Sequence, residues 1–129
     1  MKLAPIVAFG FLCICNYASG KPDLDVVSFI CSDTLFSGTD VYRASVLEVV
    51  LQLQVGTPAY GCNYHFQFTS NSDTCYGRGA CDGAFAPWDC EMCLNFAGDY
   101  LGVRCPQSVG VKLQLQDCRI RFESYSFVE

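Results

Sequence analysis

Cysteine is the residue that most constrains the fold of this chain, because it accounts for ten of the 129 residues. Two of these, Cys13 and Cys15, lie in an apolar N-terminal run that has a short basic start and ends in small residues. This pattern is typical of a secretory signal peptide over residues 1–20, with cleavage after Gly20. A membrane anchor is the alternative, but the apolar run is shorter than the roughly 20 residues that a spanning helix needs.

The mature chain, residues 21–129, is expected to be one disulfide-stabilised domain that is secreted to the apoplast. It keeps an even number of cysteines: Cys31, Cys62, Cys75, Cys81, Cys90, Cys93, Cys105 and Cys118. An even number in a small secreted chain indicates a disulfide framework, since such a domain buries only a modest core. The spacing of eight cysteines leaves their connectivity open.

Cys90 and Cys93 form a C-x-x-C motif, which elsewhere indicates redox chemistry or half of a zinc site. The sequence has no second C-x-x-C at zinc-ribbon spacing, and its only histidine is His65. The signal peptide also directs the chain to a compartment where structural disulfides dominate. We therefore expect neither a metal nor another cofactor.

The charge of the mature chain excludes several classes of partner. Seven basic residues remain against thirteen acidic ones, a net charge of −6. Phosphate backbones and anionic membranes both repel such a surface, so nucleic-acid binding and cationic membrane lysis are not expected. No segment of the mature chain is apolar enough to predict a membrane span.

The first half of the mature chain predicts a strand, a helix and a hairpin. Residues 25–31 are β-branched and aromatic, as in a strand. Residues 37–40 carry a Ser/Thr cap and an early acid, which predicts a helix over 41–54 that ends at 56–58. Its apolar stripe contains Val41, Ala44, Leu47 and Leu51 and is widened by Val46, Val50 and Leu53. The valine content makes a strand the alternative, but the length of the run favours a helix.

The hairpin is predicted from the alternation of residues 60–69, a turn at 70–73 and a return strand over 74–81. Cys62 and Cys75 lie on its two arms, so we expect these two cysteines to form a disulfide.

The second half predicts another helix and two more strands. The helix starts at Pro87 and stops at Gly102. Within 109–127 the apolar phase shifts by one residue, which predicts a bulge or tight turn near 116–117 and places Lys112 and Glu123 on the polar side of their strands. The resulting order, β-α-β-β-α-β-β, predicts an α+β domain with both helices packed on an antiparallel sheet.

Several blocks of the sequence are similar to a known family. These blocks are Phe29–Cys31, Tyr76–Cys81 with Asp89–Leu94, which contain the spacing C-x₈-C-x₂-C, and Val111–Phe122. They resemble the plant cysteine-rich secretory repeat, also called the stress-antifungal or ginkbilobin-homologous domain, in its single-domain form. The resemblance implies two helices packed on a five-stranded antiparallel sheet. It also implies the disulfides Cys31–Cys105, Cys81–Cys90 and Cys93–Cys118, which leaves Cys62 and Cys75 as a fourth pair.

The resemblance further implies a mannose-binding antifungal lectin. The family's ligand contacts are an Asn, an Arg and a Glu, and their positions hold Ser32, Lys112 and Glu123 here. Lys112 lacks the planar fork of Arg, and Ser32 is shorter than Asn, so a weakened affinity for mannose or mannan is expected. The alternative interpretation of Lys112 and Glu123 is an exposed cross-strand ion pair of little energetic weight.

Two functions therefore remain from the sequence. One is a secreted plant defence protein with antifungal activity that binds a mannose-type carbohydrate of fungal surfaces. The other is an extracellular protein-interaction module whose sugar site has decayed. An enzyme is not expected, because no nucleophile motif or oriented acid accompanies His65.

Overall fold

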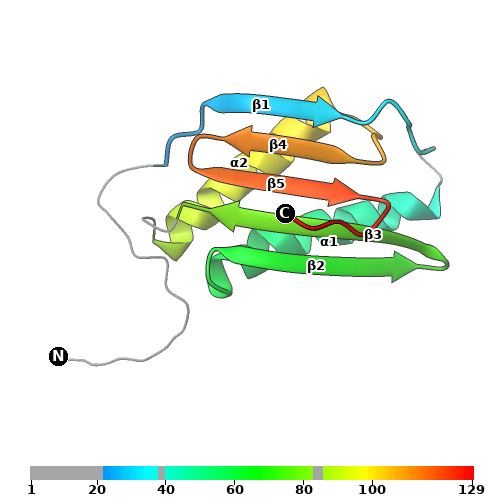
Figure 1. Cartoon of the computed structure of the whole chain (residues 1–129), viewed down its shortest axis with the longest axis horizontal. Helices are drawn as coiled ribbons and strands as arrows, with labels where there is room; N and C mark the ends of the chain where they lie inside the picture. The colour runs from blue at the N-terminus through cyan, green and yellow to red at the C-terminus, as the bar shows by residue number, and fades with distance from the viewer. Residues whose placement is uncertain (1–21, 38–39, 83–85) are drawn as a thin grey trace.

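A computed structural model of the chain describes residues 22–37, 40–82 and 86–129, and the predicted signal peptide lies outside these ranges. Figure 1 shows the described elements in the predicted order. The strands are β1 (Val26–Cys31), β2 (Asn63–Ser70), β3 (Asp73–Cys81), β4 (Val111–Leu115) and β5 (Cys118–Glu123). The helices are α1 (Val41–Ala59) and α2 (Pro87–Arg104).

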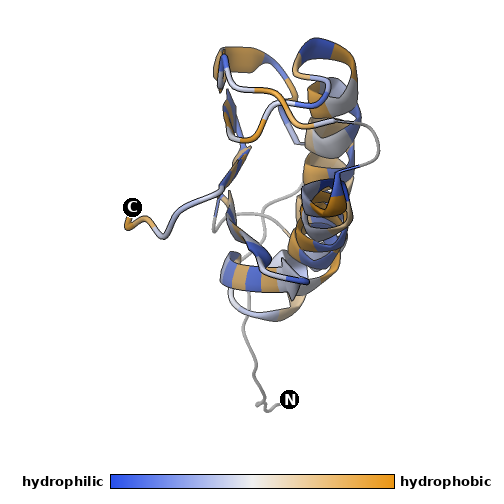
Figure 2. Cartoon of the chain, turned by 90° about the vertical axis from the view of Figure 1, so that its right-hand side faces the viewer, coloured by the Kyte–Doolittle hydropathy of each residue, from blue (hydrophilic) through white to orange (hydrophobic). Residues whose placement is uncertain are grey.

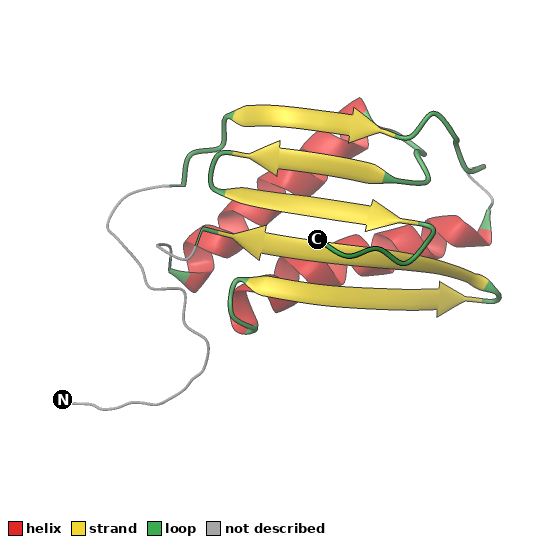
Figure 3. Cartoon of the chain, in the orientation of Figure 1, coloured by secondary structure: helices red, strands yellow, loops and turns green. Residues whose placement is uncertain are grey.

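The strands form one sheet in the order β1-β4-β5-β3-β2, in which every neighbouring pair is antiparallel. Both helices cover the same face of this sheet, with α1 behind β2 and β3 and α2 crossing behind the other strands (Figure 3). The side view in Figure 2 shows the helices as one layer and the sheet as the other. The predicted α+β architecture is confirmed, and one face of the sheet is left without a helix.

Helix α1 lies close to β3 because β3 presents glycines to it. A Cβ atom at Gly77 would collide with a methyl group of Val49, and one at Gly79 would collide with the hydroxyl of Thr57. Since side chains alternate between the faces of a strand, Arg78 between these glycines points to the opposite face. The same short segment therefore admits the helix on one side and carries a charged side chain on the other.

The predicted apolar stripe of α1 is wrong in part: Val46 and Leu53 are buried as expected, but other members of the stripe are not. Leu47 and Leu51 are 52% and 51% exposed. The face turned to the sheet instead contains Tyr42, Ser45, Val46, Val49, Leu53, Gly56 and Thr57. Small and polar residues share this face with apolar ones because the glycines of β3 allow a close approach of the helix, and apolar periodicity does not report that constraint.

Both ends of α1 also differ from the prediction. Asp40 is the N-cap, and its side chain accepts a hydrogen bond of 2.9 Å from the N–H of Tyr42, so the cap is not a Ser or Thr. The helix continues through Pro58 to Ala59. A Cβ atom at Gly56 would collide with the ring of Tyr64, so glycine at this position lets the last turns of α1 pack against β2. Tertiary packing thus outweighs the tendency of Gly and Pro to end a helix.

The remaining boundaries lie close to the prediction. Strand β2 begins at Asn63 rather than at residue 60, because Gly61 and Cys62 have positive φ angles of 91° and 63° and form the turn after α1. Helix α2 continues past Gly102 to Arg104. Residues 116–117 form the predicted tight turn between β4 and β5.

Three disulfides attach α2 to three strands. They are Cys31–Cys105, Cys81–Cys90 and Cys93–Cys118, with Cα–Cα distances of 5.4, 5.6 and 6.1 Å. These are the pairings that the family resemblance implies. Each joins a strand, namely β1, β3 or β5, to a cysteine in α2 or at its C-cap. The position of α2 on the sheet is therefore fixed covalently as well as by packing.

The expected Cys62–Cys75 disulfide is wrong. Cys75 is a free, buried thiol, whereas Cys62 is engaged elsewhere. The register of the hairpin explains the error, because Cys75 lies opposite Phe68 near the turn. Cys62 lies at the far end of the hairpin, where its carbonyl accepts a hydrogen bond of 2.9 Å from the N–H of Cys81.

The Cys75 thiol is enclosed between α1 and the sheet. Burial is the main cause that raises the pKa of Cys75 to about 12, and the nearby charge of Glu123 adds to it, although a hydrogen bond with Tyr42 acts in the opposite direction. The hydroxyl of Tyr42 donates a hydrogen bond of 2.7 Å to the carbonyl of Val109, which joins α1 to the segment before β4. The thiol is therefore a packing group at neutral pH.

We predict that Gly77→Ala lowers the free energy of unfolding by about 1–3 kcal/mol, because an added methyl overpacks the contact with Val49. The change is read as a lower midpoint in urea. Gly102→Ala is the matched control, since nothing lies within 4 Å of an added Cβ on this α2 residue. The control should be neutral or stabilising, and equal losses in both variants would contradict the close-packing account.

We also predict that Cys75 resists thiol reagents in the native protein at pH 8 and reacts once the chain is unfolded. The raised pKa stabilises the folded state fully below about pH 9, and this contribution is lost as the pH rises toward 12. Mass-spectrometric mapping after alkylation with and without denaturant measures the difference. Rapid native labelling of Cys75 would show that the thiol is open to solvent.

Candidate ligand-binding site

The face of the sheet without helices carries rows of polar side chains that run across the strands. The register aligns Ile30 of β1, Lys112 of β4, Arg121 of β5, Arg78 of β3 and His65 of β2 in one row. Lys112, Arg121 and Arg78 alternate with buried residues of β4, β5 and β3, whereas Ile30 is an exposed apolar residue of the edge strand. The predicted orientation of Lys112 toward the polar side is thus confirmed.

The neighbouring row contains the other two predicted ligand residues. Glu123 of β5 lies opposite Tyr76 of β3. On its other side, Glu123 is beside Gly110, where a Cβ atom would collide with Oε1 of its carboxylate. The carbonyl of Gly110 accepts a hydrogen bond of 2.8 Å from the N–H of Ser32. Ser32 and Glu123 therefore flank Gly110, and Lys112 lies two residues beyond it.

The carboxylate of Glu123 is held in place by Arg121. Its Oε2 accepts a hydrogen bond of 2.9 Å from Nε of Arg121, and the two side chains are 15% and 17% exposed. Burial lowers the pKa of Arg121, but hydrogen bonds to Glu123 and Tyr125 and the charges of Glu123 and Glu129 outweigh it and raise the pKa above its ordinary value. Glu123 is thus an oriented acceptor rather than a freely rotating side chain.

Lys112 and Ser32 are less constrained than Glu123. Lys112 is exposed on β4. Among the described residues the ion pair of Glu123 is with Arg121, so the alternative interpretation of Lys112 and Glu123 as a cross-strand ion pair is wrong. The Ser32 hydroxyl accepts a hydrogen bond of 3.2 Å from the N–H of Thr34 and keeps its own proton for donation.

The sequence interpretation missed a second group of polar side chains on the same face. Arg78, Arg119 and Arg121 all contact the carboxylate of Glu129, which the C-terminal segment 124–129 brings back across the sheet (Figure 1). Arg119, Arg121 and Glu123 alternate along one strand, and this pattern could have indicated a shared face. Nothing in the sequence signals the return of the C-terminal segment.

The family assignment rests on most of the chain. Residues 30–125 match the family described as salt stress response/antifungal. The chain belongs to this family. The match spans all five strands in part or in full, both helices and the cysteines of the three disulfides described above.

Several curated members of the salt stress response/antifungal family are similar in sequence. An antifungal protein ginkbilobin-like protein 1 of Picea sitchensis is 29% identical over 84% of both chains. Antifungal protein ginkbilobin-2 of Ginkgo biloba is 24% identical over 98% of this chain and 96% of that protein. Plasmodesmata-located protein 7 of Arabidopsis thaliana is 31% identical over 76% of this chain but only 33% of its own length.

Two solved structures of Arabidopsis thaliana proteins share the fold of this family member. They are the tandem DUF26 ectodomains of the cysteine-rich receptor-like proteins PDLP5 and PDLP8, with TM-scores of 0.74 and 0.75 and identities of 24% and 20%. The match covers 81% of this chain in both cases, but 52% and 50% of the two ectodomains. The chain thus spans about half of each tandem structure.

Two further features concern the part of the chain that the structure describes. No cluster of three or more His, Cys, Asp or Glu side chains in it could hold a metal ion. Neither α1 nor α2 is long and apolar enough to cross a membrane.

Proposed function

We propose that this chain is an extracellular plant defence protein with antifungal activity, and that it binds mannose-type carbohydrate at the corner formed by Ser32, Lys112 and Glu123. The observation that carries the proposal is the Glu123 carboxylate, oriented by Arg121 and seated over Gly110 beside Ser32. Three residues that are far apart in the sequence are thus neighbours on one polar face.

The chemistry of this corner suits a neutral sugar. Vicinal hydroxyl groups act as donors and as acceptors, so a fixed carboxylate and an ammonium group can bind adjacent hydroxyls of one ring. Glu123 accepts, Lys112 donates, and the Ser32 hydroxyl adds a further donor. Because the ammonium of Lys112 is a flexible point charge rather than a rigid fork, the affinity is expected to be low.

The relatives support an extracellular, non-enzymatic role. Relatives named antifungal ginkbilobin-like proteins match along most of their own length. The solved neighbours are ectodomains of cysteine-rich receptor-like proteins. In this proposal residues 1–20 direct secretion to the apoplast, residues 21–129 form the single functional domain, and the protein acts by binding rather than by catalysis.

A protein-interaction module is the second candidate, and the edge strand β1 favours it. Val27, Phe29 and Ile30 are 55%, 39% and 64% exposed. An edge strand with unpaired backbone groups and exposed apolar side chains is suited to a protein partner rather than to a sugar. Antifungal activity without any affinity for mannosides would favour this candidate.

We predict that Glu123→Gln weakens binding of methyl α-mannoside or mannan about tenfold or more, because hydrogen bonds to a charged group contribute about 1.5–3 kcal/mol. Isothermal titration calorimetry on the oxidised mature protein measures the affinity. Glu91→Gln is the matched control, since Glu91 is exposed on α2 on the opposite side of the sheet. Equal affinities of all three proteins, or no heat with any mannoside, would contradict the assignment.

A gain of affinity tests the same corner in the other direction. The double substitution Ser32→Asn and Lys112→Arg restores the residue types that the family resemblance implies. We predict binding about three- to tenfold tighter than that of the unsubstituted protein, because the guanidinium holds two hydroxyls in a fixed geometry. Unchanged affinity in a correctly folded double variant would show that the sugar does not contact these two positions.

A further inference from the structure

Three arginine side chains converge on one point of the open face. Nη1 of Arg78 lies 3.2 Å from Oε1 of Glu129, and Nε of Arg119 lies 3.4 Å from the same oxygen. Nη1 of Arg121 lies 3.5 Å from Oε2. Nη1 of Arg78 also donates to the main-chain carbonyl of Glu129 at 3.0 Å. The cluster thus binds the side-chain carboxylate and a main-chain oxygen of the same residue.

The geometry of this cluster requires an anion. Arg78 and Arg121 are directly paired across β3 and β5, an arrangement in which like charges repel. The Arg78 side chain is only 8% exposed, and its Nε and Nη2 both donate to Oδ1 of Asn63, at 3.0 and 2.8 Å. Arg78 is therefore held by Asn63 of β2 as well as by Glu129.

The cluster also stands out against the charge of the whole chain. The formal net charge is −5, yet four of the eight basic residues, Arg78, Lys112, Arg119 and Arg121, lie on this one face. A basic face on an acidic protein attracts acidic ligands while the remaining surface repels them. The basic face is thus a specific feature and not a consequence of composition.

The C-terminal segment is held mainly by the side chains of Phe127 and Glu129. Residues 124–129 form no strand or helix, and Val128 is 94% exposed. The Phe127 ring lies 4.0 Å from the guanidinium carbon of Arg121, a cation–π contact that accompanies the Glu129 ion pairs. The cluster therefore contacts an aromatic residue and an acidic residue two positions after it.

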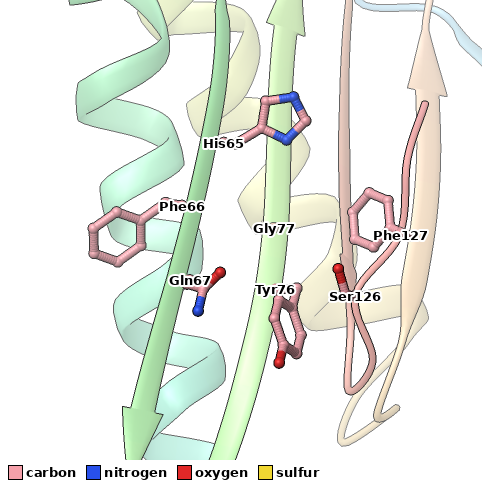
Figure 4. Close-up of a pocket in the computed structure, with 7 residues that line it drawn as sticks. All are labelled: His65, Phe66, Gln67, Tyr76, Gly77, Ser126 and Phe127. Atoms are coloured by element: carbon pink, nitrogen blue, oxygen red, sulfur yellow. The ribbon is translucent and has the colours of Figure 1, made fainter.

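The segment fills this surface incompletely. A pocket of about 180 Å³ remains between Ser126 and Phe127 on one side and strands β2 and β3 on the other. Figure 4 shows His65, Gln67 and Tyr76 projecting along its strand side. A longer or differently spaced peptide could occupy this space as well as the arginine cluster.

We propose that Arg78, Arg119 and Arg121 form a docking site for an acidic peptide segment of a protein partner, and that the chain's own residues 124–129 occupy it as an internal competitor. This site is distinct from the proposed carbohydrate site at Ser32, Lys112 and Glu123, although Arg121 lies in the cluster and also contacts Glu123. A tethered segment acts at a millimolar effective concentration, so an external peptide must bind more tightly or the segment must be displaced.

The test compares the full mature chain with its Phe127→Ala/Glu129→Ala variant. The probe is the peptide Ser-Tyr-Ser-Phe-Val-Glu with both ends capped, so that its Glu side chain carries the only charge. NMR titration should show the probe binding to the double variant about tenfold or more tightly than to the unsubstituted chain. Adding Arg119→Gln to the double variant should reduce this binding about tenfold, since a charged hydrogen bond is lost.

Matched controls make the result specific. Arg43→Gln, an exposed change on α1, should not alter probe binding to the double variant, and Val128→Ala in the unsubstituted chain should not open the site. If the double variant folds poorly, Glu129→Gln takes its place, because it preserves the bulk of the segment. It should open the site more weakly than the double substitution. The proposal would be overturned if a probe ending in Gln bound as tightly as the probe ending in Glu. It would also be overturned if trigalacturonate, an acidic carbohydrate, bound more tightly than the peptide, or if the peptide bound to neither folded variant.

Discussion

Strand β3 determines both layers of this molecule. Gly77 and Gly79 leave no side chain toward α1, so Val49 and Thr57 approach the strand backbone directly. Tyr76 and Arg78 alternate with these glycines and therefore project from the opposite face. A bulky residue at either glycine would push α1 away.

The two helices are secured in different ways. Close packing against the glycines of β3 holds α1, whereas three disulfides attach α2 to β1, β3 and β5. The Cys31–Cys105 disulfide also fixes the end of β1, and this places Ser32 beside Gly110 and Glu123. The proposed carbohydrate site is thus formed on a part of the sheet that cannot shift without breaking a disulfide or the hydrogen bonds between strands.

The sequence predicted the element order, the α+β class and the polar orientation of Lys112 and Glu123, because alternation and capping are local signals. It could not predict partners that register decides. The hairpin places Cys75 opposite Phe68 rather than near Cys62. The buried face of α1 follows the glycines of β3, so Leu53 is buried whereas Leu47 and Leu51 are exposed. The sequence does not predict the arginine cluster, because the residue that it binds, Glu129, comes from a segment without secondary structure.

The central claim is that a mannose-type carbohydrate binds at Ser32, Lys112 and Glu123. A residue-resolved NMR titration with a mannoside tests it most directly, since the titration reports where the ligand binds without any substitution. The account predicts that the largest shifts occur at the backbone amides of Ser32, Lys112 and Glu123, with smaller shifts at Arg121. Shifts confined to α1 and α2, or no shifts at a saturating concentration of mannoside, would contradict it.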